Sequence, residues 1–207
     1  MAYYLETTTS SATGAYVSLQ SRIDYLRDGG AGYTGEFEVE FKVDVTGSTA
    51  VIFGSGSTAA SDRIVFFTSE FNLNIRRPSP SSPDANFALP QSCFGVHTYR
   101  IVGSLTPSSQ IEVFQDGVSC GTATNSDLIF IETLFLFGSS SRFSRFYYSK
   151  FYNNGVLTNH LDPSATVGTG LVLEDTTGTN DGTLNNFPTN NSQWVFYSSG
   201  TEAAITE

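Results

Sequence analysis

The sequence is poor in lysine and in long apolar runs, and both shortages exclude classes of partner. Lys42 and Lys150 are the only lysines, and the 207-residue chain carries a formal net charge of −10. A nucleic acid or an anionic membrane surface requires a basic footprint, so neither is expected as a partner. No stretch approaches the ~20 apolar residues that cross a bilayer, so membrane insertion is not expected either.

Cysteine and histidine are too few and too scattered to form a recognised zinc site. The cysteines are Cys93 and Cys120, and two alternatives stay open for them: a disulfide between adjacent strands, or two buried free thiols. The histidines are His97 and His160, and neither lies in a triad context. A Gly-x-Ser-x-Gly elbow is also missing, so nucleophilic catalysis is not expected. We interpret His97 as a hydrogen-bonded structural residue and His160 as a loop residue.

The first residues lack the features of a secretory signal peptide. Met1-Ala2-Tyr3-Tyr4-Leu5-Glu6 has no basic n-region and no apolar h-region. We therefore expect synthesis in the cytoplasm of the producing cell. An extracellular role would then need another route out of the cell, such as assembly into a particle released by lysis.

The residues that are abundant favour strands and turns. The chain contains 17 Phe and 10 Tyr, with 19 Gly and 7 Pro between the apolar segments. Aromatic and β-branched residues suit strands, whereas Gly and Pro suit turns. The length fits one large all-β domain over residues 1–207, because such folds often reach ~200–250 residues.

Strict alternation of apolar and charged residues runs along Glu36–Val45, which predicts a strand with one buried and one solvated face. Asp116-Gly117 and Asn153-Asn154-Gly155 predict tight hairpin turns. We therefore predict an antiparallel sandwich or barrel. Further strands are expected at Ala50–Gly54, Arg63–Thr68, Phe71–Arg76, Val96–Val102, Gln110–Gln115, Val118–Thr122, Leu128–Ile131, Leu134–Phe137, Phe143–Tyr152, Val156–Thr158, Leu171–Glu174 and Trp194–Tyr197.

Three motifs in the second half occur in an order found in a known superfamily. The first pairs His97–Val102 with Ile111–Val118, the second runs from Arg145 to Leu157, and the third runs from Leu173 to Leu184. Together they resemble the concanavalin A-like lectin/glucanase superfamily, especially laminin-G-like jelly rolls of tailed-bacteriophage virion proteins. Asn153 stands where that pattern usually has Asp. The resemblance implies an all-β, antiparallel two-sheet jelly-roll β-sandwich, whose C-terminal strand is expected beside an N-terminal one.

The resemblance implies a non-enzymatic virion surface protein, either a capsid decoration or a tail-associated adhesion module. Its expected partners are other virion proteins, cell-surface glycans or both, and a homo-oligomer is an open alternative. A free-standing carbohydrate-binding lectin is the second interpretation. The third is a glucanase-type hydrolase that uses Glu36, Glu38 and Glu40. Because the same charge alternation continues through Lys42 and Asp44, we interpret these carboxylates as a solvated strand face rather than as catalysts.

Two sets of residues are candidates for ligand binding. Sugar binding requires aromatic rings beside hydrogen-bonding groups. The sugar-binding candidates are Tyr148, Lys150, Tyr152, Trp194, Arg76 and Arg77. Tyr148, Lys150 and Tyr152 are expected on one strand face, with Tyr147, Ser149 and Phe151 on the other. The resemblance also suggests a Ca²⁺ site, for which Asp175, Asn180 and Asp181 offer oxygen ligands. Ca²⁺ takes six or more oxygens, however, and only three can be named. Tight turns also select the same residue types, so we favour a turn. No cofactor is otherwise expected.

Overall fold

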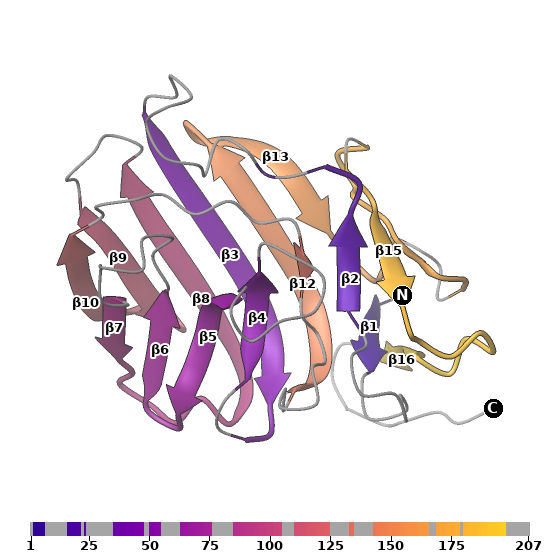
Figure 1. Ribbon diagram of the computed structural model, residues 1–207, viewed down its shortest axis with the longest axis horizontal. Coiled ribbons are helices and arrows are strands. Elements are labelled where there is room, and N and C mark those ends of the chain that lie inside the picture. Colours follow the sequence, from indigo (N-terminus) through magenta and orange to yellow (C-terminus); the bar gives the residue numbers. More distant parts are fainter. Residues whose placement is uncertain are drawn as a thin grey trace.

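The computed structural model consists of two antiparallel β-sheets packed face to face (Figure 1). The part of the chain that it describes contains no helix long and apolar enough to cross a membrane. The described residues are 2–6, 16–21, 23, 35–47, 50–54, 63–75, 85–104, 110–124, 133–134, 143–165, 169–178 and 180–197.

The first sheet, called sheet A, contains the long strands of the molecule. Its order is β10-β9-β8-β3-β12-β1-β16, and β13 pairs with β12. The strands are β1 (Ala2–Glu6), β3 (Glu36–Val45), β8 (Gly95–Ser104), β9 (Gln110–Gln115), β10 (Val118–Thr124), β12 (Phe143–Asn153), β13 (Val156–Leu161) and β16 (Trp194–Tyr197). The C-terminal strand β16 pairs with β1, with Leu5 opposite Trp194, so the predicted return to the N-terminus is confirmed.

The second sheet, called sheet B, contains shorter strands in the order β14-β15-β2-β11-β4-β5-β6-β7. Its strands are β2 (Tyr16–Leu19), β4 (Val51–Gly54), β5 (Arg63–Ser69), β6 (Asn72–Ile75), β7 (Ala85–Ala88), β11 (Thr133–Leu134), β14 (Val172–Leu173) and β15 (Gly182–Asn185). Strands β1, β2, β7 and β15 were not expected from the sequence. The strand expected at Leu128–Ile131, and the part of the next one after Leu134, lie outside the described residues.

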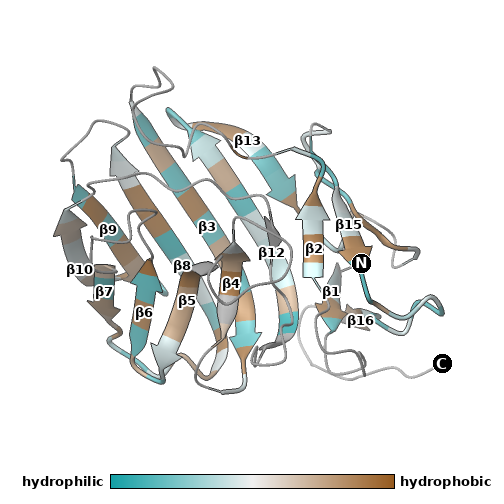
Figure 2. Ribbon diagram, in the orientation of Figure 1, coloured by the Kyte–Doolittle hydropathy of each residue, from teal (hydrophilic) through white to brown (hydrophobic). Residues whose placement is uncertain are grey.

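The core lies between the sheets, and the alternation of β3 explains why. Phe37, Val39, Phe41, Val43 and Val45 are buried and belong to one core cluster, while the residues between them face solvent. Figure 2 shows this alternation as bands of opposite hydropathy along β3. The strand predicted over Glu36–Val45 is therefore confirmed at both ends.

Two β-bulges in β12 change which residues share a face. Phe146 lies opposite Val43 and Tyr148 opposite Lys42, so Tyr147 is an extra residue between these pairs. Such an insertion moves a side chain to the other face of the sheet. Tyr147 accordingly lies against Tyr4, 5.6 Å between ring centroids, with the Lys42 ammonium 5.0 Å from its ring. The prediction that Tyr147 shares the face of Ser149 and Phe151 is wrong.

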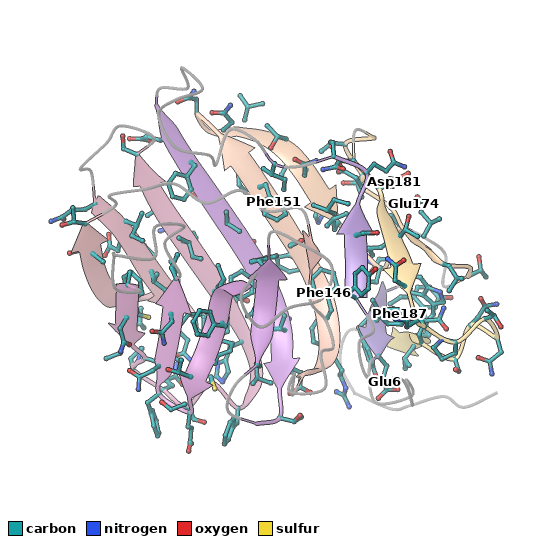
Figure 3. The ribbon with its side chains drawn as sticks, in the orientation of Figure 1. Glu6, Phe146, Phe151, Glu174, Asp181 and Phe187 are labelled. Carbon is teal, nitrogen blue, oxygen red and sulfur yellow. The ribbon has the colours of Figure 1, made fainter. Side chains whose placement is uncertain are left out.

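The β12 residues that point inward still form part of the core. Phe146 and Phe151 are fully buried between the two sheets (Figure 3). Tyr148, Lys150 and Tyr152 share the opposite face, as the sequence predicted, because alternation resumes after the bulge. This face of sheet A, turned away from sheet B, is called the outer face below.

The two predicted hairpin turns are confirmed by their backbone angles. Asp116 and Gly117 have φ of 49° and 81°, and Asn154 and Gly155 have φ of 50° and 74°. Two successive positive φ angles characterise the turn type that matches the twist of antiparallel strands. Asn, Asp and Gly adopt this conformation at low cost, which explains their selection at these positions.

Cys93 and Cys120 are free thiols in the structure and do not form the disulfide of the first alternative; Cys93 is buried, whereas Cys120 is half-buried. Cys93 is buried after β7, and its Sγ lies 3.8 Å from the Ser69 carbonyl oxygen. Cys120 lies in β10, and its Sγ is 3.8 Å from the Val118 carbonyl oxygen. Each thiol therefore has a backbone partner of its own. Burial raises the pKa of Cys93 to about 11, and burial also raises the pKa of Cys120.

We expect both thiols to react slowly in the folded protein, because the thiolate is the reactive form and burial disfavours it. Titration with Ellman's reagent in denaturant, without reductant, should find both thiols. The native protein at about pH 8 should react much more slowly than a free cysteine of ordinary pKa. A denatured sample with no titratable thiol would show that the disulfide forms after all.

Candidate functional site

A groove crosses the outer face of sheet A at the end where β3 begins. It encloses about 590 Å³, and its polar lining includes Glu36 and Glu38 of β3, Glu112 of β9 and Tyr152 of β12. The rest of the lining consists of Phe37, Val102, Gly103, Ser104, Gln110, Thr122 and Gly155. We call this feature the groove.

Strand register places the groove residues in a straight row. Tyr152 lies opposite Glu38, Glu38 opposite Val102, Val102 opposite Glu112, and Glu112 opposite Thr122. The row therefore crosses β12, β3, β8, β9 and β10 at right angles to the strands. Residues directly opposite in an antiparallel pair have Cβ atoms ~4.5–5.5 Å apart, so each residue of the row contacts the next. The row thus carries two carboxylates on either side of Val102, a hydroxyl at one end and an aromatic ring at the other.

The carboxylates of the groove differ in what holds them. Glu38 is 3.4 Å from the Arg100 guanidinium, which also lies 4.4 Å from the Phe114 ring centroid. Glu112 accepts a hydrogen bond of 2.6 Å from the Ser119 hydroxyl. Glu36 is exposed at the first position of β3. The groove thus has an excess of negative charge, with one carboxylate directed to solvent.

Beside the groove, the same face carries a ladder of paired charges and rings. Lys150 is 3.2 Å from Glu40 and 4.6 Å from the Tyr148 ring centroid. Arg145 is 3.8 Å from Asp44 and lies over the Tyr4 ring. Burial raises the pKa of Tyr148 to about 12, and the Glu40 carboxylate adds to this rise. We call this region the paired ladder.

The structure separates the predicted sugar-binding residues. Tyr152 lines the groove, whereas Tyr148 and Lys150 are engaged with each other and with Glu40 in the paired ladder. Trp194 is 7% exposed, belongs to the core cluster and donates its indole N–H to the Gly170 carbonyl at 2.9 Å. A buried ring offers no face for stacking, so Trp194 is not a sugar platform. Arg76 and Arg77 lie outside the described residues.

The side-chain oxygens of the three predicted Ca²⁺ ligands, Asp175, Asn180 and Asp181, accept hydrogen bonds from other groups of the protein. Asp175 is buried and accepts hydrogen bonds from the His160 and Thr177 backbone N–H groups, from the Thr177 hydroxyl and from the Asn159 amide. Asp181 accepts the Asp175 N–H at 2.8 Å, and Asn180 exchanges two hydrogen bonds with the Ser21 backbone. The described residues contain no group of three His, Cys, Asp or Glu placed to hold a metal ion. This arrangement fits a turn and does not fit the six or more oxygens that Ca²⁺ takes.

Asp175 gives the fold a dependence on acid that can be measured. Burial by itself raises the pKa of Asp175, but its hydrogen bonds from His160, Thr177 and Asn159 outweigh burial and lower the pKa below 3.8. A lowered folded-state pKa contributes stability above the unfolded value, and this contribution is lost as the pH falls through the folded value. Below about pH 4 the free energy of unfolding should therefore decline.

The substitution Asp175→Asn should flatten this acid decline, because the amide does not titrate. At neutral pH it should lower the free energy of unfolding by about 1–3 kcal/mol, since an amide N–H₂ replaces one acceptor oxygen. Urea melts at several pH values measure both effects. Glu174→Gln, at an exposed position, is the control and should match wild type. An acid decline as steep as that of wild type in Asp175→Asn would show that other groups cause it.

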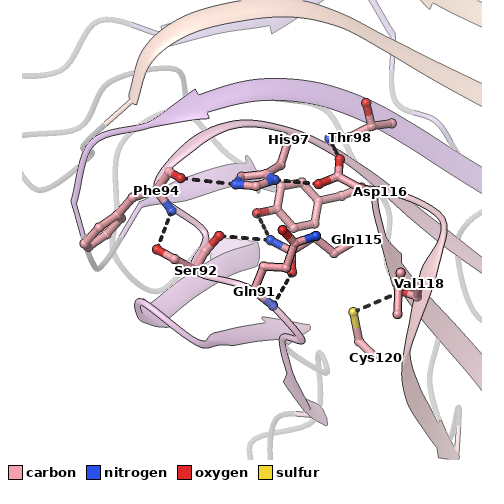
Figure 4. A network of polar contacts seen from close by, with 10 residues as sticks. Gln91, Ser92, Phe94, His97, Thr98, Gln115, Asp116, Val118 and Cys120 are labelled. Carbon is pink, nitrogen blue, oxygen red and sulfur yellow. Dashed lines mark hydrogen bonds and ion pairs between the residues drawn. The ribbon is translucent and has the colours of Figure 1, made fainter.

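His97 has a hydrogen-bond partner at each ring nitrogen, and His160 has one at Nδ1. His97 Nδ1 is 2.6 Å from Asp116 and its Nε2 is 3.1 Å from the Phe94 carbonyl oxygen (Figure 4). The structural interpretation of His97 is confirmed. His160 lies in β13 and not in a loop, so that expectation is wrong. Its Nδ1 is 2.9 Å from the Thr176 hydroxyl, its Nε2 is 3.9 Å from Asp162, and burial lowers its pKa.

Sequence reasoning missed Glu112, Val102 and Thr122 as site residues. Alternation along Gln110–Gln115 does place Glu112 on the polar face of its strand. What alternation lacks is the register between strands, which decides that Glu112 and Glu38 flank the same residue, Val102. The groove residues can therefore be identified only from the register between strands and not from the sequence of any one strand.

Two eight-stranded antiparallel sheets in this order, together with the likeness to the first solved structure below, confirm the predicted fold, an all-β jelly-roll sandwich of the concanavalin A-like type. No protein-family model and no curated protein matches the sequence. Among solved structures, 89% of the chain matches a provisionally named carbohydrate-binding protein from Bacteroides ovatus ATCC 8483, with a TM-score of 0.55 and 11% identity. The chain covers 58% of that protein.

A second solved structure has a lower similarity. It is a native heptameric SAP-like pentraxin from Limulus polyphemus, with a TM-score of 0.40 and 12% identity over 75% of this chain and 76% of that one. At such identities, structural likeness bears on the fold alone.

Proposed function

We propose that this chain is a non-enzymatic glycan-binding module whose ligand lies in the groove. The observation that carries the proposal is the row from Tyr152 to Thr122, which places an aromatic ring, two carboxylates and a hydroxyl on one rigid sheet face. Sugar rings stack on aromatic side chains, and their hydroxyls donate hydrogen bonds to carboxylates. Strands hold such groups more precisely than loops do. The name of the Bacteroides ovatus protein supports the same class of ligand.

The chemistry of the lining favours a ligand rich in donors and free of negative charge. Ionised carboxylates only accept hydrogen bonds, so the ligand groups that contact Glu36, Glu38 and Glu112 should be donors such as hydroxyl or ammonium groups. Among the described residues, the groove lining includes no lysine or arginine. Like charges across an interface are strongly unfavourable, so neutral and amino sugars should bind and uronic or sialic acids should not.

The absence of catalysis is part of the proposal. Glu38 and Glu40 each pair with a cation on a neighbouring strand, as structural cross-strand ion pairs do. Retaining hydrolysis requires two carboxyl groups flanking the scissile bond, one of which donates a proton. Glu40 is part of the paired ladder, both ring nitrogens of His97 are hydrogen-bonded, and so is Nδ1 of His160. We therefore expect no turnover of β-glucans.

A virion surface is the proposed setting, as a capsid decoration or a tail-associated adhesion module. The resemblance of Arg145–Leu157 to a run in phage jelly rolls supports this setting, and other virion proteins are then the second class of partner. Copurification with capsid or tail proteins at high copy number would support it. Recovery from host cells only as a free protein would contradict it.

A glycan array followed by titration calorimetry tests the ligand. Three probes separate the chemistry: cellotetraose is neutral, the glucosamine tetrasaccharide is cationic and tetragalacturonate is acidic. We expect binding of the first two, weakened by Glu112→Gln, with Glu174→Gln as a matched exposed control. An array without signals, or with acidic glycans alone, would overturn the proposal. A reducing-sugar assay on the bound probes should show no cleavage, and cleavage lost in Glu38→Gln would revive the hydrolase.

A further inference from the structure

One end of the groove is formed where two strands stop pairing. The ladder between β12 and β3 ends at Asn153 opposite Phe37, and Asn154 then begins the turn to β13. Glu36 is the first residue of β3. Its neighbours in the groove, Tyr152 and Gly155, lie on the β12–β13 hairpin. The groove therefore depends on contacts made just past the end of a ladder, where strands usually fray.

Asn154 extends the ladder by one pair through its side chain. Its backbone N–H donates to the Glu36 carbonyl at 2.8 Å, and the Glu36 N–H donates to the Asn154 Oδ1 at 2.9 Å. In a regular antiparallel pair, two residues exchange such bonds through their backbones. Asn154 has a φ of 50°, so its chain turns and the side-chain carbonyl accepts the bond instead.

The adjoining backbone is shaped around this side chain. A methyl group added to Gly35 would overlap the Asn154 side chain, and Gly35 has a φ of 115°. The positive φ favours glycine at position 35, and a larger residue there would displace the Asn154 side chain. The Asn154 amide also donates to the Asn153 side-chain oxygen at 3.2 Å, at the exposed surface of the turn. We call the two hydrogen bonds between Asn154 and Glu36 the latch.

We infer that Asn154 is a positioning residue of the groove, which holds Glu36 against the β12–β13 hairpin before a glycan arrives; this rests on the proposed function. The latch joins Glu36 to the hairpin that bears Tyr152 and Gly155. Groups held in their bound geometry lose less conformational freedom on binding, so affinity rises without a new contact to the ligand. Asn154 acts through Glu36 and is not itself in the groove lining.

The test replaces Asn154 without straining the turn. Asn154→Gly keeps the backbone bond and tolerates positive φ, but it removes the acceptor of the Glu36 N–H. Asn154→Asp restores an acceptor in a residue that also tolerates this conformation. Asn153→Ala is the matched control, because it removes the bond to the Asn154 amide and leaves both bonds to Glu36. Amide hydrogen exchange at Glu36 and affinity for cellotetraose and the glucosamine tetrasaccharide are the two readouts.

We expect Asn154→Gly to speed exchange at the Glu36 amide and to weaken both probes by roughly 2–10-fold, the loss of about one hydrogen bond. Asn154→Asp should return exchange to near the wild-type rate, and Asn153→Ala should match wild type in both readouts. Faster exchange with unchanged affinity would overturn the positioning role while glycan binding stands. Unchanged exchange would overturn the latch itself. If the wild-type protein binds neither probe, the proposed function fails, and the role of Asn154 in affinity fails with it.

Discussion

Phe41→Ala should lower the free energy of unfolding by about 3–5 kcal/mol, the cost of deleting a large ring from a packed core. Phe41 is fully buried in β3. Its ring stacks on Tyr99 of β8 at 5.3 Å and meets Phe53 of β4 edge-on at 5.2 Å. Because β8 and β4 belong to opposite sheets, the cavity would open at the contact between them.

The matched control for this change is Phe71→Ala. Phe71 is 49% exposed at the turn between β5 and β6, so the same substitution there removes little buried surface. Surface changes of this kind usually alter stability by about 0.5 kcal/mol or less. Urea melts of both variants, compared at equal m-values, measure the difference. Equal losses would mean that the two sheets do not pack through Phe41.

The elements that the sequence predicted well are those whose pattern is local. Glu36–Val45 alternates without interruption, so both its boundaries and its buried face could be read directly. Asp116-Gly117 and Asn154-Gly155 adopt the φ values that their residue types favour. In each case, residues adjacent in the chain decide the outcome. The fold class follows from many such segments in succession.

What the sequence could not supply depends on residues far apart in the chain. Tyr147 changes face because β12 pairs with β3 through a bulge, and no local pattern marks the extra residue. Trp194 is buried because β16 pairs with β1, whose Leu5 lies opposite it. Glu112 reaches the groove through the register of β8 with β9. Each outcome is set by strand pairing. A shift of two residues in the register leaves every side chain on the same face, so alternation cannot tell one such register from another.

The same reasoning separates the two regions of the outer face. Tyr148, Lys150 and Tyr152 share a face by alternation, and the sequence gives no reason to prefer one of them. Cross-strand partners make the distinction: Lys150 lies opposite Glu40 and forms an ion pair, whereas Tyr152 lies opposite Glu38 at the groove. A paired cation must lose its carboxylate before it can bind a ligand, whereas a ring that lines a groove is available at once.

Tyr152→Ala should weaken binding of cellotetraose and the glucosamine tetrasaccharide by at least about tenfold, because aromatic anchors carry a large share of binding energy. Tyr152 is half-buried at the aromatic end of the row and makes its ring available to the groove. Tyr152→Phe keeps the ring and loses the hydroxyl, so it should retain most of the affinity if stacking dominates.

Tyr148→Ala provides the comparison, because it deletes the same side chain from the same strand face. Tyr148 lies in the paired ladder, with the Lys150 ammonium 4.6 Å from its ring centroid, so its loss should change probe affinity much less. Calorimetric titration of the three variants, with circular dichroism to confirm folding, measures these differences. If Tyr148→Ala abolishes binding and Tyr152→Ala does not, the glycan binds on the paired ladder and the groove is not the site.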